Sequence, residues 1–268
     1  MAYVLVLTNI KGGEGKTTSS VVIAYGLARR GKRVLLVDMC QQSNATYTIL
    51  GEIMKTPENT IYEVLMKERD IREPDIIRPS PHPNLFIVPG TLWMTQAEVE
   101  LVQAMGRELK LRTALEPVLD RVDYIVIDTP PSLGLLTTNA LFASTHLLIP
   151  VQLEAYGLVG IEILLTSLEL MRSNAIARAL GITMPITGVL LTKVRLPLTN
   201  DAKGHLEEIQ AYFGEKLFQT LIPLNVKVSE ANGIQTPLYD YAPTSSGARA
   251  YSGLVEEVIS RVERVEQQ

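Results

Sequence analysis

Lys11-Gly12-Gly13-Glu14-Gly15-Lys16-Thr17-Thr18 is a glycine-rich segment that comes shortly after the apolar run Tyr3–Leu7. A strand that leads through such a loop into a helix places backbone N–H groups around the phosphates of a nucleotide. Glycine is required in the loop because a Cβ would obstruct both the tight turn and the close approach of the backbone to the phosphates. In this arrangement Lys16 contacts the β- and γ-phosphates, and Thr17 binds magnesium. The segment therefore predicts a site for a nucleoside triphosphate and Mg²⁺, with an ordinary glycine-rich turn as the alternative.

Short runs rich in Val, Ile and Leu alternate with helical patterns along the chain. This alternation predicts an α/β protein of the P-loop NTPase class, with a doubly wound, mostly parallel sheet and helices on both faces. Strands are expected at Tyr3–Asn9, Arg33–Asp38, Leu85–Pro89, Tyr124–Asp128, His146–Val151, Ile186–Thr192 and Phe218–Ile222. Helices are expected at Thr17–Arg29, Gln96–Leu119, Leu158–Ala179, Ala202–Phe213 and Ser245–Val265. A chain of 268 residues can bury a large core, and we expect residues 1–268 to form one domain.

The composition limits the partners and the compartment of the protein. Its formal net charge of −4, from 25 Lys plus Arg and 29 Asp plus Glu, requires that any nucleic acid be bound by a local basic patch. The single cysteine, Cys40, excludes internal disulfides and four-cysteine metal sites made within one chain. The sequence shows neither a signal-peptide pattern nor an apolar segment of roughly 18 residues, the length that crosses a bilayer. We therefore expect a cytoplasmic protein.

Two of the predicted strands end in an aspartate, Asp38 and Asp128. Ligands of open parallel sheets lie beyond the carboxyl ends of the strands, so both carboxylates are expected to lie beside the phosphate loop. Asp128 has the position of a Walker B aspartate, which holds magnesium through its water shell because this cation prefers oxygen ligands. A strand-end aspartate also occurs as a turn or helix-capping residue. The preceding glycine-rich loop favours the functional interpretation.

Lys11 makes the loop similar to the deviant Walker A box of the ParA/MinD family of ATPases. In that family the first lysine of the loop crosses a dimer interface to the partner's nucleotide, whereas the alternative for Lys11 is a solvated surface lysine. The segment Asp128–Asn139 resembles the switch II segment of the ParA branch, a loop that responds to the γ-phosphate. The resemblance is closest to the short, Soj-type partition ATPases. It implies ATP as the nucleotide, with the Gly12–Thr18 backbone around its phosphates, and a homodimer that sandwiches two ATP molecules.

The segment Asp38–Thr46 resembles the family's switch I box, but Cys40 replaces its second aspartate. In the family that aspartate lies beside the attacking water and is required for hydrolysis, whereas Asp38 keeps the position of a magnesium ligand. A thiol with a pKa of about 8.5 is mostly neutral at pH 7 and is a weak hydrogen-bond partner for water. Three outcomes remain open, namely slow hydrolysis, water orientation by Gln41 or Gln42, and a protein that mainly binds ATP. We expect weak hydrolysis that a partner stimulates.

The resemblance implies a catalytic set of Lys11, Lys16, Asp38 and the position of Cys40, with magnesium held by Thr17, Asp38 and Asp128. Glu14 is a second departure, since the family usually has a small or apolar residue there. A carboxylate beside phosphates is repelled unless it points outward. The alternatives are a solvated side chain, which we expect, and a contact with Lys11 or with the partner subunit.

The carboxyl-terminal half contains two more segments that resemble the family, Gly188–Lys193 and Ile222–Ala231. They imply that Lys193 and Pro223 flank the adenine, although each alone fits an ordinary strand-end lysine or loop proline. Nonspecific DNA binding by the family implies exposed basic residues in this half. Candidates are Lys203, Lys227 and Arg249, with Lys216 as an addition, and their alternative is ordinary solvated surface. Contacts of this kind reach phosphate, read no bases and weaken with salt.

The resemblance implies a ParA-type ATPase that positions or partitions a plasmid, a chromosome or a protein body. A ParB-like or other adaptor protein is expected to stimulate hydrolysis, and nucleoid association follows from DNA binding. One alternative is a switch that binds ATP with little hydrolysis. Another is a MinD-like protein, which needs a basic amphipathic helix that lies on the membrane. The last predicted helix has an apolar stripe but a net acidic opposite face, so we expect it to pack on the domain.

Overall fold

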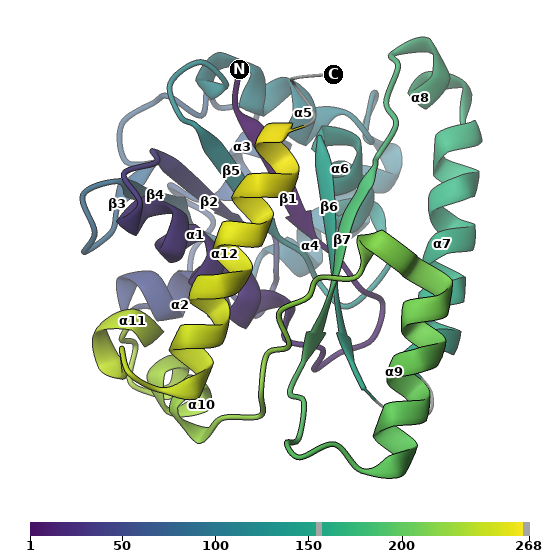
Figure 1. Ribbon diagram of the computed structural model, residues 1–268. Helices are drawn as coiled ribbons and strands as arrows, with labels where there is room; N and C mark the ends of the chain where they lie inside the picture. The colour runs from purple at the N-terminus through teal and green to yellow at the C-terminus, as the bar shows by residue number, and fades with distance from the viewer. Residues whose placement is uncertain (154–156, 265–268) are drawn as a thin grey trace.

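The computed structural model describes residues 1–153 and 157–264, and its centre is a seven-stranded sheet (Figure 1). The strand order is β3-β4-β2-β5-β1-β6-β7. Six strands are parallel, and only the short edge strand β3 runs antiparallel to its neighbour β4. The strands are β1 (Tyr3–Leu7), β2 (Val34–Asp38), β3 (Arg78–Pro79), β4 (Leu85–Val88), β5 (Tyr124–Asp128), β6 (His146–Gln152) and β7 (Ile186–Thr192).

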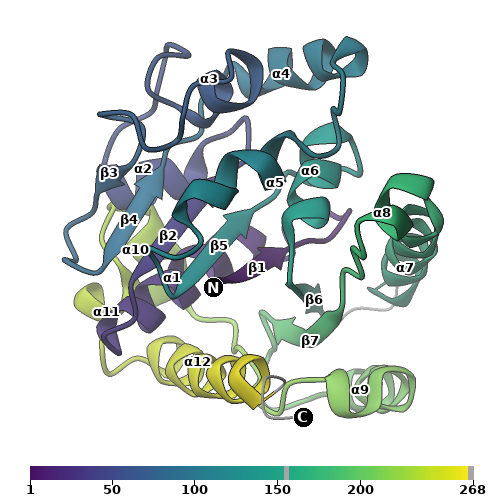
Figure 2. The same cartoon turned by 90° about the horizontal axis from the view of Figure 1, so that it is seen from above.

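Helices cover both faces of the sheet, as expected for a doubly wound fold (Figure 2). Successive residues of β1 point to opposite faces, so Leu5 and Leu7 pack with α1 and α12 while Val4 and Val6 pack with α5, α6 and α7. The α-helices are α1 (Lys16–Arg29), α2 (Asn44–Leu50), α3 (Ile61–Met66), α4 (Met94–Glu100), α5 (Lys110–Leu115), α6 (Leu135–Ala143), α7 (Gly157–Ser173), α8 (Ala175–Ala179), α9 (Asn200–Phe213), α10 (Val226–Gly233), α11 (Leu238–Tyr241) and α12 (Ser246–Arg264).

The register of the parallel strands brings their carboxyl ends together at one edge of the sheet. Leu7 of β1 and Asp38 of β2 are both paired with Asp128 of β5. The phosphate loop follows β1 directly at this edge, at the bottom of the view in Figure 1. The two strand-end carboxylates therefore lie beside the loop, as the sequence predicts.

Three predicted elements differ in the structure. The helix expected at Gln96–Leu119 is divided into α4 and α5 by a short 3₁₀ turn at Leu101–Gln103 and by Gly106, whose φ of 59° no right-handed α-helix accommodates. The helix expected at Leu158–Ala179 is broken at Asn174, which caps α8 by accepting a hydrogen bond from the Ile176 N–H. No strand forms at Phe218–Ile222, where one is expected: the Phe218 and Ile222 N–H groups donate to carbonyls of β7, and isolated bridges flank the segment at Leu217 and Pro223.

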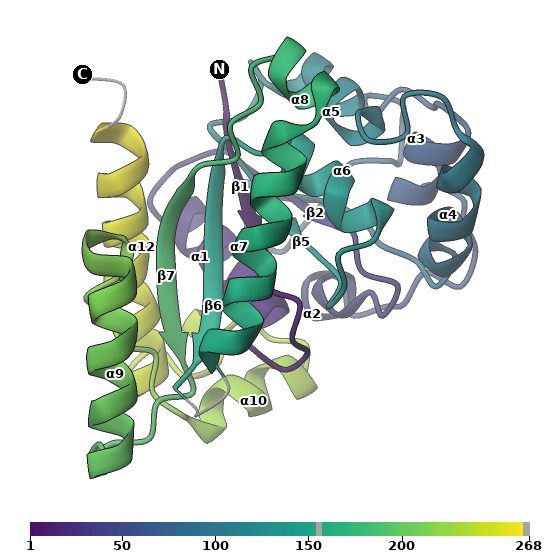
Figure 3. The same ribbon diagram turned by 90° about the vertical axis from the view of Figure 1, so that its right-hand side faces the viewer.

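The last helix packs on the domain through its apolar stripe, as expected (Figure 3). Val255, Val258 and Val262 of α12 are fully buried in the cluster that also contains α1. Val265, which the sequence places on the same stripe, lies outside the described residues. Among the helices within residues 1–153 and 157–264, none combines the length and the apolar character needed to cross a membrane.

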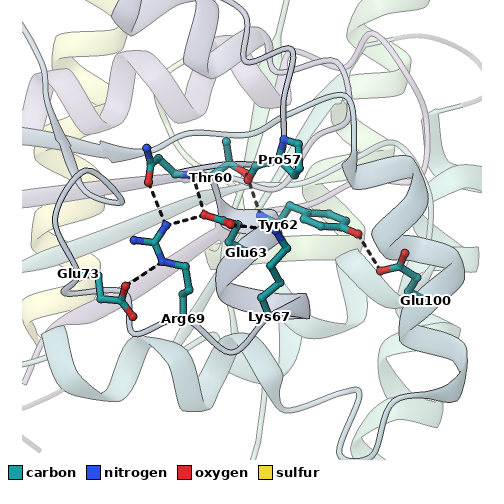
Figure 4. A network of polar contacts seen from close by, with 9 residues as sticks. Pro57, Thr60, Tyr62, Glu63, Lys67, Arg69, Glu73 and Glu100 are labelled. Carbon is teal, nitrogen blue, oxygen red and sulfur yellow. Dashed lines mark hydrogen bonds and ion pairs between the residues drawn. The ribbon is translucent and has the colours of Figure 1, made fainter.

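A buried carboxylate organises the segment around α3 (Figure 4). Glu63 accepts hydrogen bonds from the Asn59 N–H at 2.8 Å, from Arg69 at 2.6 Å and from Lys67 at 3.1 Å. Burial acts to raise the pKa of Glu63, but these donors outweigh it and lower that pKa to about 2. Glu63 is therefore ionised at neutral pH and holds three parts of this segment together.

Candidate functional site

The glycine-rich loop adopts the conformation that its glycines permit. Gly13 and Gly15 have φ values of 83° and 84°, in the left-handed region that other residues avoid. Asn9 fixes the start of the loop, because its side chain donates to the Pro150 carbonyl at 2.7 Å and accepts from the Lys11 N–H at 3.1 Å. The loop ends where α1 begins, so the N–H groups of the first helical turn face the centre of the loop.

The ends of β6 and β7 hold the loop from its other side. The side chains of Gln152 and Lys193 both donate to the Gly13 carbonyl at 2.7 Å. The Thr192 hydroxyl donates to the Glu14 carbonyl at 2.9 Å. These contacts come from residues more than a hundred positions later in the chain, and they fix the loop against two strands of the sheet.

A pocket of about 360 Å³ opens above the loop. It unites the phosphate loop with the segment after β2, the segment after β5 and the end of β7. Its lining residues are Gly12, Gly13, Gly15, Lys16, Thr17, Thr18, Cys40, Gln41, Gln42, Asn44, Thr129, Pro131 and Lys193. Most of the residues that the sequence assigns to nucleotide binding thus meet in one cavity.

Lys16 lies at the base of this pocket. Its side chain is buried, and its Nζ donates to the Lys11 carbonyl at 3.0 Å. Burial lowers the pKa of the Lys16 ammonium from its usual value, and the nearby Asp128 carboxylate opposes this shift. The helix N-terminus and this ammonium together make the pocket suitable for an anion.

Asp38, Cys40 and Asp128 form a buried cluster next to the pocket, with ligand atoms within 4.8 Å of one another. Asp38 accepts hydrogen bonds from the Cys40 N–H and from both the N–H and the hydroxyl of Thr46, at 2.7–3.0 Å. Burial raises the pKa of Asp38, and burial together with Asp38 raises the pKa of Asp128. A bound cation would stabilise the ionised form of two adjacent buried carboxylates of this kind.

The oxygen atoms around this cluster are suitable ligands for magnesium. The Thr17 and Ser20 hydroxyls hydrogen-bond to Asp128, so hydroxyl and carboxylate oxygens converge beside the loop. These hard oxygen donors are the ligands that Mg²⁺ prefers. The Cys40 thiol lies 3.5 Å from Asp128 and donates to it. Burial and the two neighbouring carboxylates raise the pKa of this thiol well above its usual value, which keeps it neutral.

Glu14 is not solvated, so the expectation of a solvated side chain is wrong. Only 2% of the residue is exposed, and its carboxylate accepts a hydrogen bond from the Gln152 N–H at the end of β6. Its other oxygen lies 3.2 Å from the Lys11 Nζ. The burial arises because the end of β6 supplies a backbone donor and Lys11 supplies a counter-charge, so the alternative contact with Lys11 is the one that forms.

Lys193 and Pro223, the residues expected to flank adenine, lie close together but not in one cavity. Val194 and Pro223 form an isolated bridge, and the Leu224 N–H donates to the Val194 carbonyl at 2.8 Å. Pro223 therefore lies next to the end of β7. Lys193 lines the pocket above the loop, whereas Pro223 is not among the residues that line it.

The candidates for DNA contact, Lys203, Lys227 and Arg249, are all exposed and belong to α9, α10 and α12. These helices begin at the edge of the sheet that carries the phosphate loop (Figures 1 and 3). Lys227 pairs with Glu230 at 2.7 Å. Lys216 follows α9 and lies about 20 Å along the helix from Lys203, at the other end, so it is separate from this group.

Sequence reasoning missed the residues that hold the loop in place, Asn9, Gln152 and Thr192. Their contacts join segments far apart in the chain, and no local spacing signals them. The available signal is their position at the ends of predicted strands, because the carboxyl ends of parallel strands converge on the loop.

Residues 2–182 match the family model described as an AAA domain. The chain is also 43% identical over 258 residues to the sporulation initiation inhibitor protein Soj of Bacillus subtilis, covering 96% of this chain and 98% of that protein. It is 39% identical over 258 residues to the chromosome partitioning protein ParA of Myxococcus xanthus, covering 96% of this chain and 88% of that protein.

The fold is also similar to a solved nucleotide complex. This is cobyrinic acid a,c-diamide synthase of Mycobacterium smegmatis with a bound ATP analogue and magnesium. The two structures have a TM-score of 0.80 and 26% sequence identity, over 98% of this chain and 96% of the other. The similarity identifies an α/β P-loop NTPase fold, in agreement with the prediction from the sequence.

Proposed function

The chain belongs to the ParA/Soj family of partition ATPases, and on this premise we propose that it forms an ATP-sandwich dimer that positions or partitions a cargo on DNA. The observation that carries the proposal is the pocket that unites the phosphate loop with the segments after β2 and β5. A γ-phosphate in this pocket contacts all three segments, so its presence or loss changes the surface that they form. We also infer that residues 1–268 act as one domain, since all strands in the described part of the chain belong to one sheet.

The proposed roles follow the geometry of the pocket. The buried Lys16 ammonium and the first turn of α1 bind the phosphates, and Lys193 with the nearby Pro223 flanks the base. Thr17, Asp38 and Asp128 would hold Mg²⁺, and the cation would neutralise charge on the phosphates. Lys11 reaches the nucleotide of the second subunit.

We propose that hydrolysis is slow and that an adaptor protein of the ParB type stimulates it. A neutral thiol occupies the Cys40 position, and it donates a hydrogen bond to Asp128. Sulfur is a weak hydrogen-bond partner for an attacking water. The same observation favours a second candidate, an ATP-binding switch with little turnover, and Gln41 and Gln42 are the polar side chains that line the pocket nearby.

Nonspecific DNA binding, and with it nucleoid association, is proposed for the surface near Lys203, Lys227 and Arg249. All three are exposed on helices that begin at the nucleotide edge of the sheet, which supports a link between nucleotide state and DNA contact. With a net charge of −4, the protein binds through these local charges alone. Contacts with DNA phosphate are therefore expected to be sensitive to salt.

The test is binding to a random-sequence DNA duplex with ATP, with ADP and without nucleotide, each across a salt series. We expect binding only with ATP, independent of sequence and weaker at higher salt. Lys16→Ala serves as the control that lacks nucleotide binding. If an ATP dimer forms but binds no DNA with ATP, with ADP or without nucleotide, the DNA part of the proposal is wrong. The dimer then acts on a membrane or on another protein.

A further inference from the structure

We propose that Glu14 is a positioning residue that holds Lys11 on its own subunit and thereby competes with formation of the ATP dimer. The inference rests on the proposed function, in which Lys11 crosses to the nucleotide of the second subunit. It concerns a residue of the phosphate loop that does not line the pocket above the loop and whose carboxylate contacts the end of β6. The Glu14 carboxylate thereby makes the ATP dimer weaker than it would be if the same loop lacked this charge.

The Glu14 side chain is fixed in place. One oxygen accepts a hydrogen bond from the Gln152 N–H, and the Glu14 carbonyl accepts one from Thr192 at 2.9 Å. The preceding residue, Gly13, accepts hydrogen bonds from both Gln152 and Lys193. The carboxylate therefore stays with β6, and any change in the Lys11–Glu14 contact must come from Lys11.

Lys11 is the nearest counter-charge of the Glu14 carboxylate. The residue is 2% exposed, and its Oε1 is buried and accepts no hydrogen bond among the residues that the structure describes. The Lys11 ammonium, 3.2 Å from this oxygen, is its counter-charge. A buried carboxylate that loses its nearest counter-charge becomes costly, because the remaining attraction, that of the buried Lys16 ammonium, is shared with Asp128.

Lys11 is able to leave, since its side chain is 40% exposed. When it moves to a phosphate of the second subunit, it must break the ion pair and leave Glu14 with the Gln152 N–H alone. The free energy of the new contact with phosphate is then reduced by the cost of the broken pair. Only a strongly negative group on the second subunit offsets this cost. Glu14 therefore makes dimer formation more dependent on the negative charge of the bound triphosphate.

The test compares Glu14→Gln with the wild type by sedimentation velocity, over a range of protein concentrations, with ATP and with ADP. Glutamine has the same shape and still accepts from the Gln152 N–H, so it removes the charge while keeping the anchor. We expect the Kd of the ATP dimer to fall about tenfold in Glu14→Gln. Glu14→Val is expected to shift the Kd in the same direction, and thermal melting checks that both variants fold.

Lys11→Ala and the double variant supply the matched control. If Glu14 acts through Lys11, the effect of Glu14→Gln on the dimer Kd disappears in the Lys11→Ala background. An equal Kd for the wild type and Glu14→Gln, or a weaker dimer in Glu14→Gln, overturns the inference while leaving the sandwich dimer intact. Absence of an ATP dimer in every variant instead overturns the proposed dimer itself, and the inference with it.

Discussion

At the scale of single residues, the site consists of charges held close together by short contacts. Lys16, Lys193 and Lys11 each contact a loop carbonyl or carboxylate, at 3.0, 2.7 and 3.2 Å. Asp38 and Asp128 lie on adjacent strands with their carboxylates buried. Cations near the loop and anions behind it create a field that suits the magnesium nucleotide of the proposed function.

Lys16→Ala is expected to abolish measurable ATP binding. In the proposed ATP complex the ammonium makes charge-assisted contacts with the phosphates, each contributing about 1.5–3 kcal/mol, so the expected loss of affinity is about 100-fold or more. Calorimetric titration with ATP and Mg²⁺ measures it. Lys32→Ala is the control, because Lys32 pairs with Glu263 outside the pocket and its loss is expected to leave ATP affinity unchanged.

Cys40→Asp is expected to raise ATP turnover about tenfold or more, because a carboxylate beside the attacking water acts as a base or orients the water. The variant places a third carboxylate beside Asp38 and Asp128, so it is also expected to melt at a lower temperature without Mg²⁺ than with it. Phosphate release and thermal melting measure the two effects. Cys40→Ser, which adds no charge, should retain the wild-type rate. Equal turnover in Cys40→Asp and Cys40→Ser would contradict the assigned role of this position.

At the scale of elements, close packing between helices sets what the sequence tolerates. A Cβ added at Gly26 of α1 would lie 2.8 Å from Val255 of α12 and 2.9 Å from the Tyr239 hydroxyl. Valine in a helix has essentially one χ1 rotamer and cannot turn away. Gly26 therefore allows α1 and α12 to approach each other closely.

Gly26→Ala is expected to destabilise the protein by about 1–3 kcal/mol, since the clash outweighs the better helix propensity of alanine. Urea unfolding measures the change. Gly204→Ala in α9 is the matched control. A Cβ there meets open space, so the same substitution is expected to stabilise by about 0.5–1 kcal/mol. Because the two changes in the free energy of unfolding have opposite signs, the comparison separates the effect of packing from that of helix propensity.

The network around α3 predicts a pH-dependent contribution to stability. The pKa of Glu63 is lowered from 4.5 to about 2, so the unfolded chain binds the proton more readily than the folded one. The stabilisation is fully present above about pH 4.5 and is lost as the pH falls toward 2. We expect Glu63→Gln to lower the free energy of unfolding by about 2–3 kcal/mol at pH 7 and by less at pH 4.

Urea unfolding of both proteins at pH 7, 5 and 4 tests this dependence. Glu73→Gln removes the other carboxylate that binds Arg69, at 2.9 Å, from a side chain that is 44% exposed. Its effect is expected to be below about 0.5 kcal/mol at each pH. A loss in Glu63→Gln that does not change between pH 7 and pH 4 would contradict the assigned pKa.

At the scale of the whole molecule, the edge of the sheet that carries the nucleotide pocket also carries the proposed DNA surface. Lys203→Ala, Lys227→Ala and Arg249→Ala are each expected to reduce the salt dependence of ATP-dependent DNA binding by about one unit of slope. Fluorescence anisotropy with a labelled duplex measures the slope. Lys216→Ala changes an exposed lysine beyond the far end of α9, and its slope should equal that of the wild type.

The sequence predicts those features that local spacing determines. The glycine-rich loop, the two strand-end aspartates and the order of β and α elements follow from neighbouring residues. The burial of Glu14 does not, because its donor Gln152 lies 138 positions later. The break in the helix expected at Gln96–Leu119 is signalled in the sequence by Gly106. The interrupted pairing of Phe218–Ile222 has no such signal, because it depends on packing against β7.

The central position of β1 has a consequence for synthesis of the chain. Tyr3 pairs with Tyr124 and Leu5 with His146, so both neighbours of this apolar strand are translated long after it. At about 5–20 residues per second, the emerging segment waits on the order of ten seconds for them. The phosphate loop waits longer still, until Thr192 and Lys193 arrive to hold it. A nascent chain on the ribosome therefore carries its nucleotide motif early but acquires an ordered nucleotide site late.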